Sequence, residues 1–150
     1  MPSIPSSGPL SLKDLHDDFK KFPTTNPTNI SLNTLIQDYL CVTTTNKPIS
    51  EFYNSTYLNP FIISETAGDD AEDTCEIPRP NFGGKGAALA YHNGTGTNPV
   101  KNDTVYTSYK GLNGASCSNT TWPSGFYRMD NGDVLNVLGT GVVKGVTECE

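Results

Sequence analysis

The stretch that decides the fold of the second half is Gly125-Phe126-Tyr127-Arg128-Met129-Asp130-Asn131-Gly132-Asp133-Val134-Leu135-Asn136-Val137-Leu138. Two apolar-rich runs flank its Asp-Asn-Gly centre. Asn-Gly is typical of the tight turns between antiparallel strands, because both residue types tolerate positive φ. The stretch therefore predicts a β-hairpin. A second turn leads into residues 142–147, so we expect a third antiparallel strand there.

Similar patterns extend β structure toward the N-terminus and predict an antiparallel β region over residues 82–150. Residues 87–92 and 103–109 are expected strands, and the second alternates apolar and polar side chains. Residues 58–81 are expected to be a loop-rich linker with a short strand at 58–63. Their acidic run at 68–73 lacks the ligand order of a calcium loop and is interpreted as a solvated loop.

The N-terminal third repeats one helix-start pattern. Ser11 and Ser31 are each preceded by an apolar residue and followed by apolar residues at helical spacing, which favours N-caps with hydrophobic staples. We expect short helices at 12–21 and 32–41 and a helix or turn at 50–57. The apolar residues of this pattern are either the inner face of a helical hairpin or a docking surface: Leu10, Leu12, Leu15, Phe19, Ile30, Leu32, Leu35 and Tyr39.

The expected fold class is therefore α+β, with short helices followed by a small antiparallel meander or sandwich. Residues 1–9 lack an apolar period and are expected to be an extended arm. The predicted organisation is an arm at 1–9, stapled helices at 10–57, a linker at 58–81 and the β region at 82–150.

The four cysteines are widely spaced and form no Cys-x-x-Cys pair, which argues against a structural zinc site: Cys41, Cys75, Cys117 and Cys149. The N-terminus lacks a basic region followed by an apolar stretch, so cytosolic synthesis is expected. That compartment favours reduced thiols. A disulfide between Cys117 and Cys149, across the C-terminal strands, remains the alternative.

Composition limits the classes of partner. The net charge is −6 and the basic residues are scattered, so electrostatic binding of nucleic acid is not expected. No apolar run is long enough for a transmembrane helix. Hydrophobic residues make up only 35% of the chain, and 14 Gly with 11 Pro indicate many turns and short elements.

The sequence motifs do not favour an enzyme. His16 and His92 are expected to be surface residues, and neither a nucleophile elbow nor a His-Glu-x-x-His pattern occurs. A pair of carboxylates for glycoside cleavage stays open, since acids are plentiful. Gly83-Gly84-Lys85-Gly86 does not match a phosphate-binding loop. We expect no catalytic residue, no metal and no cofactor.

The string Ile4-Pro5-Ser6-Ser7-Gly8-Pro9-Leu10-Ser11-Leu12, with its echoes near Ile30 and at Pro48-Ile49-Ser50-Glu51-Phe52-Tyr53, resembles the N-terminal signature of tailed-bacteriophage virion proteins. In those proteins, segments of this type open tail, baseplate or neck components. The resemblance covers residues 4–53 and departs from the pattern at 20–29, where the joint is longer. Residues 116–149 similarly resemble small C-terminal β modules of phage tail and fibre proteins.

The resemblance implies a non-enzymatic virion component that acts by subunit docking, made in the host cytoplasm and then built into the particle as a homo-oligomer with other virion proteins. Nucleic acid and membrane are not expected partners. Trp122, Phe126 and Tyr127 are expected to form either a contact patch or part of the β core. Two alternatives remain: a capsid decoration or cement protein, and a carbohydrate-binding module in which Trp122, Tyr106 and Tyr109 hold a host glycan.

Overall fold

The structure is a computed structural model, which describes residues 58–108 and 119–150. Apart from Leu58 and Asn119, these residues form one compact unit. Of the linker expected at 58–81, residues 59–81 belong to this unit, together with residues 82–108 and 120–150 of the expected β region. The expected arm and the expected helices at 12–21, 32–41 and 50–57 lie outside the described residues.

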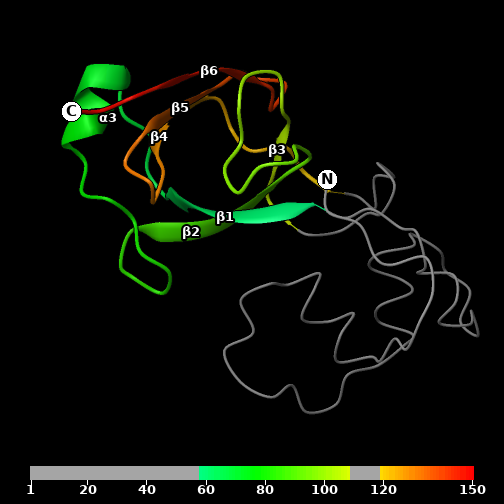
Figure 1. Ribbon diagram of the computed structural model, residues 1–150, viewed down its shortest axis with the longest axis horizontal. Coiled ribbons are helices and arrows are strands. Elements are labelled where there is room, and N and C mark those ends of the chain that lie inside the picture. The colour runs from blue at the N-terminus through cyan, green and yellow to red at the C-terminus, as the bar shows by residue number, and fades with distance from the viewer. Residues whose placement is uncertain (1–57, 109–118) are drawn as a thin grey trace, which may run out of the picture. The chain divides into compact units, whose positions relative to one another are not determined.

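The described residues are mostly β, in two three-stranded antiparallel sheets (Figure 1). The first sheet has the order β1-β2-β3, and the second has the order β4-β5-β6. Their bounds are β1 Asn59–Ser64, β2 Ala87–His92, β3 Val105–Tyr106, β4 Gly125–Arg128, β5 Val134–Val137 and β6 Val143–Thr147. The predicted hairpin at 125–138 is confirmed, with Tyr127 opposite Leu135.

Backbone bridges join the two sheets at both of their edges. Thr104 bridges Val142, which links the segment before β3 to the start of β6. Ile63 bridges Met129, which links β1 to the end of β4. The strands therefore follow one another in a ring, β1-β2-β3-β6-β5-β4 and back to β1. Such closure covers strand edges that would otherwise be free to pair with other chains.

Both sheets contribute to one hydrophobic core. Ile63, Val105, Leu135 and Val143 are each 0% exposed, and they come from four different strands. The remaining buried members of the cluster are Phe61, Ala90, Tyr127, Met129 and Val137. Because each side chain of this size contributes about 2 kcal/mol when fully buried, the core is the main source of stability for the ring.

Helix α3 (Ala71–Glu76) occupies part of the acidic segment that was expected to be a solvated loop. Asp70 is its N-cap and accepts a hydrogen bond from the amide of Asp73 at 2.9 Å. Acidic residues in the first turn also stabilise the positive end of the helix dipole. The prediction of a solvated loop at 68–73 is therefore wrong for residues 71–73, because it counted the acids as solvated charge and overlooked the cap.

Arg128 of β4 holds the C-terminal end of α3. Its Nη1 donates to the carbonyl oxygens of Cys75 and Ile77, the latter at 2.6 Å, and its Nε donates to the carbonyl of Gly132 at 3.2 Å. The last carbonyls of a helix have no partner within the helix. The guanidinium therefore supplies donors that α3 needs and ties the helix to the β4–β5 turn.

A disulfide joins Cys75, in the last turn of α3, to Cys149, beyond the end of β6, with a Cα–Cα distance of 5.6 Å. The expectation of reduced thiols is wrong for these two residues. The alternative pairing of Cys117 with Cys149 is also wrong, because Cys149 is bonded to Cys75. Sequence spacing could not select the partner, since α3, which places Cys75 near the chain end, was not foreseen.

Of the other four predicted strands, three are confirmed and one is shorter than expected. Those at 58–63, 87–92 and 142–147 are confirmed to within one or two residues, which is the usual uncertainty of element ends. The strand expected at 103–109 is reduced to β3. Its flanks make other contacts: the Asp103 side chain accepts a hydrogen bond from the amide of Val100, and Thr107 pairs with Thr120.

Candidate functional site

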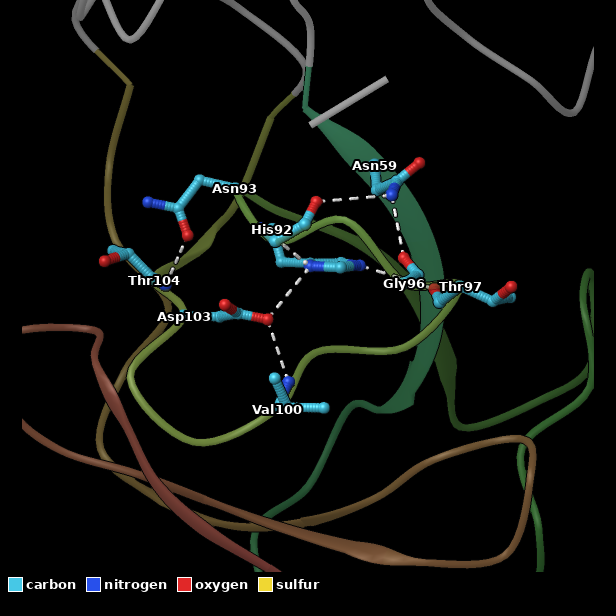
Figure 2. A network of polar contacts seen from close by, with 9 residues as sticks. Asn59, His92, Asn93, Gly96, Thr97, Val100, Asp103 and Thr104 are labelled. Carbon is cyan, nitrogen blue, oxygen red and sulfur yellow. Dashed lines mark hydrogen bonds and ion pairs between the residues drawn. The ribbon is translucent and has the colours of Figure 1, made fainter.

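The most elaborate polar site of the described residues is centred on His92, the last residue of β2 (Figure 2). The side chain is 0% exposed, so the expectation of a surface histidine is wrong. Its ring makes an edge contact with Phe61, with the ring centres 5.5 Å apart. In β3, Val105 stands opposite it in register. Residues 93–103, which we call the histidine loop, close over it.

Two backbone groups determine which nitrogen of the imidazole carries the hydrogen. The amide of Gly94 donates to Nδ1 at 3.1 Å. The carbonyl of Thr97 lies 3.4 Å from Nε2, and a carbonyl only accepts. Nδ1 is therefore the unprotonated nitrogen and Nε2 carries the hydrogen, which makes His92 neutral in this arrangement.

Burial keeps the ring neutral. It lowers the pKa of His92 below its ordinary value, and the Thr97 carbonyl and the Asp103 carboxylate oppose this shift without cancelling it. Oδ2 of Asp103 lies 3.6 Å from Nδ1. A proton that reached Nδ1 would therefore meet a carboxylate that stabilises the imidazolium.

Two asparagines fix the histidine loop to the sheet. Asn59 of β1 donates from Nδ2 to the carbonyl of Gly96 at 2.7 Å and to that of Gly94 at 3.4 Å. Asn93 accepts the amide hydrogen of Thr104 on its side-chain Oδ1 at 2.8 Å, while its own amide donates to the Thr104 carbonyl at 3.2 Å. Figure 2 shows the Asn59 side chain directed at the loop backbone and the Asn93 side chain directed at Thr104, the residue that follows the loop.

Gly94 has no room for a side chain. A Cβ on this residue would lie 2.0 Å from Oδ2 of Asp103. The carboxylate therefore packs directly against the Gly94 backbone while it also accepts a hydrogen bond from the amide of Val100 at 2.9 Å. The histidine, the glycine amide and the aspartate thus form one closely packed group.

This arrangement limits the chemistry of His92. Both ring nitrogens already have partners and the side chain has no exposed surface, so a substrate from solution cannot reach it. The groups that it can act on are those of the histidine loop itself. Sequence reasoning misplaced His92 at the surface and overlooked Asn59 and Asp103. The available signal was His92 immediately before an Asn-Gly pair, with an aspartate at the far end of the same connection.

The predicted aromatic residues lie in or near the core. Tyr127 is buried, and burial raises its pKa. Trp122 is partly buried against the core, and its ring meets the Tyr127 ring edge-on at 6.0 Å. Phe126 is half-buried on β4. The structure thus brings Trp122 and Tyr127 together as packing partners. The predicted interface residues from Leu10 to Tyr39 lie outside the described residues, as does Tyr109.

Residues 58–108 and 119–150 contain no cluster of His, Cys, Asp or Glu side chains arranged to hold a metal ion. In the same part of the chain, no helix has the length and apolar character needed to cross a membrane. No family model, curated protein or solved structure matches the sequence.

Proposed function

We propose that the chain is a structural component of a tailed-phage virion, placed in the tail, baseplate or neck, or where a fibre attaches, and that it acts by docking on neighbouring subunits. The observation that carries this proposal is the order and spacing of the N-terminal segment, with the Ile-Pro-Ser-Ser-Gly-Pro-Leu-Ser-Leu string at 4–12 and its echoes up to residue 53. In this reading, the arm and the stapled helices attach the protein to its neighbours.

The described unit suits such a role. Its strands form a closed ring, a disulfide fixes its C-terminal end, and its histidine is buried where no substrate reaches it. These features favour a durable module over a catalyst. The partial burial of Trp122 against the core and its edge contact with Tyr127 also favour packing over a platform for sugar rings.

The experiment compares the solution mass of the whole chain with that of a shortened chain beginning at Thr24, by light scattering. We expect the whole chain to be an oligomer and the shortened chain a monomer. Leu12→Asp together with Leu32→Asp should mimic the truncation, because a charge on the apolar stripe opposes its burial. Val146→Asp is the matched control, since Val146 is already 38% exposed on β6.

If neither variant lowers the mass of an oligomeric whole chain, the docking role of the N-terminal segment is refuted. A monomeric whole chain would also count against the proposed homo-oligomer.

A further inference from the structure

Asn93 and Gly94 form an Asn-Gly pair, whose side chain and following backbone amide are the two reactants of a known intramolecular reaction. In Asn-Gly sequences the amide nitrogen of the glycine can attack the side-chain carbon Cγ of the asparagine and close a five-membered succinimide ring. The reaction needs a base to remove the amide proton and donors to stabilise the oxygen that becomes negative. The residues that flank the histidine loop, His92 and Thr104, supply both.

The base is Nδ1 of His92, which is the unprotonated nitrogen and accepts the Gly94 amide hydrogen at 3.1 Å. The N–H bond lies in the plane of the peptide, whereas ring closure uses the nitrogen orbital perpendicular to that plane. The base therefore does not obstruct the attack. Asp103 is a positioning residue: its Oδ2, 3.6 Å from Nδ1, stabilises the imidazolium that forms.

The donor is the amide of Thr104, which is hydrogen-bonded to Oδ1 of Asn93 at 2.8 Å. It polarises the side-chain carbonyl in the ground state and remains available to stabilise the oxygen as it becomes negative in the tetrahedral intermediate. The asparagine is itself exposed, so water can reach the product.

We propose that Asn93–Gly94 is a self-modifying site, at which His92 is the base that converts Asn93 into a mixture of aspartate and isoaspartate. The Gly94 nitrogen loses its proton to Nδ1 and forms a bond to Cγ of Asn93. The Cγ–Nδ2 bond then breaks, and Nδ2 leaves as ammonia with the proton that His92 returns. Water adds to one of the two carbonyl carbons of the succinimide and opens the ring, which gives the aspartyl or the isoaspartyl product.

The modification changes the histidine loop irreversibly. It places a new carboxylate in a loop where the Asp103 carboxylate is already packed, and the isoaspartyl form lengthens the main chain between β2 and β3. The hydrogen bonds that Asn93 makes with Thr104 depend on the original geometry. The fraction of modified chains therefore records the age of the folded protein.

The chain contains its own control. Asn131 is also followed by glycine, and its Oδ1 likewise accepts a backbone amide hydrogen, from Asp133 at 3.0 Å. The Gly132 amide, however, donates to the carbonyl of Met129 at 3.0 Å, which is no base. In both of the described Asn-Gly pairs a backbone amide donates to the asparagine side chain, but only the Asn93–Gly94 pair has a base at the glycine amide.

The test incubates the whole folded chain at neutral pH and follows both asparagines by peptide mapping, with mass spectrometry for deamidation and a methyltransferase assay for isoaspartate. We expect Asn93 to react about a hundredfold faster than Asn131, the low side of general-base catalysis. In urea the two rates should converge. His92→Gln should slow Asn93 to about the rate of Asn131, and folding of that variant is checked by circular dichroism.

The pH profile of the unaltered chain gives a second test that needs no variant. Asp103 is the charged group that faces the ring among the described residues; β1 contributes the uncharged Phe61 and Asn59. The Asn93 rate should rise as His92 becomes neutral and then level off, whereas the Asn131 rate should keep rising with hydroxide. Equal rates at the two asparagines in the folded chain, or an Asn93 rate without a plateau, would overturn the proposal.

Discussion

Replacing both Cys75 and Cys149 with serine is expected to lower the free energy of unfolding by about 4 kcal/mol. The disulfide joins residues 74 positions apart. A crosslink that closes a loop of this length restricts the unfolded chain, and the chain-entropy relation gives a stabilisation of about 4 kcal/mol. For a domain whose total stability is about 5–15 kcal/mol, this is a large fraction.

The assay is urea unfolding of the unaltered chain and of the double serine variant, followed by Trp122 fluorescence without reductant. With a slope of about 2 kcal/mol per M for a chain of this size, the midpoint should fall by about 2 M. Serine at both positions is cleaner than reductant, because the chain also contains Cys41 and Cys117. The single Cys149→Ser variant separates loss of the crosslink from the change at Cys75.

A double variant within about 1 kcal/mol of the unaltered chain would refute the reasoning, because the entropy relation leaves no room for so small an effect at this loop length. An unchanged midpoint with a changed slope would have another meaning. It would show that the crosslink alters the compactness of the unfolded state, or that unfolding is no longer two-state.

Three further outcomes are expected. Arg128→Met should cost about 2 kcal/mol in urea unfolding, because the carbonyls of Cys75 and Ile77 lose a charged donor, and a cost near zero would contradict this role. Leu135→Ala should cost about 3 kcal/mol in the same assay, since the side chain is 0% exposed in the core, and a value below about 1 kcal/mol would contradict the packing. Burial lowers the pKa of His92, so as the pH falls the unfolded state takes up a proton before the folded state does. The contribution of neutral His92 to the free energy of unfolding should be complete above about pH 6.5 and decrease as the pH drops toward the lowered pKa. Urea midpoints measured across that pH range should show this decrease in the unaltered chain and lose it in His92→Gln.

The strands could be predicted from the sequence wherever the residues of the strand and its adjoining turn are sufficient to specify it. Asn131-Gly132 between two apolar runs specifies a hairpin, because the turn and the flanking strands agree, and β4 and β5 follow. β1 and β2 were likewise visible as short apolar runs. In each case the information lies within a few residues of the element that it predicts.

The remainder depends on contacts between distant segments. α3 forms in an acidic run because Asp70 caps one end and Arg128, from β4, supplies donors to the other. The partner of Cys149 then follows from the position of α3. The Asp70 cap is local and could have been found in the sequence. Local patterns cannot reveal the Arg128 contact or the disulfide, since the residues involved are more than fifty positions apart.

His92 shows the same limit at the level of a site. A histidine at the end of a strand and before a turn is expected at the surface. In the folded chain, however, His92 is fully buried. Asn59 of β1 and Asp103 at the far end of the loop draw residues 93–103 over the ring, so the burial that makes Nδ1 an unprotonated acceptor is a product of the assembled sheet. The same burial closes the ring to outside substrates and leaves the Gly94 amide as a partner, which is why the chemistry that this histidine can perform is directed at its own loop.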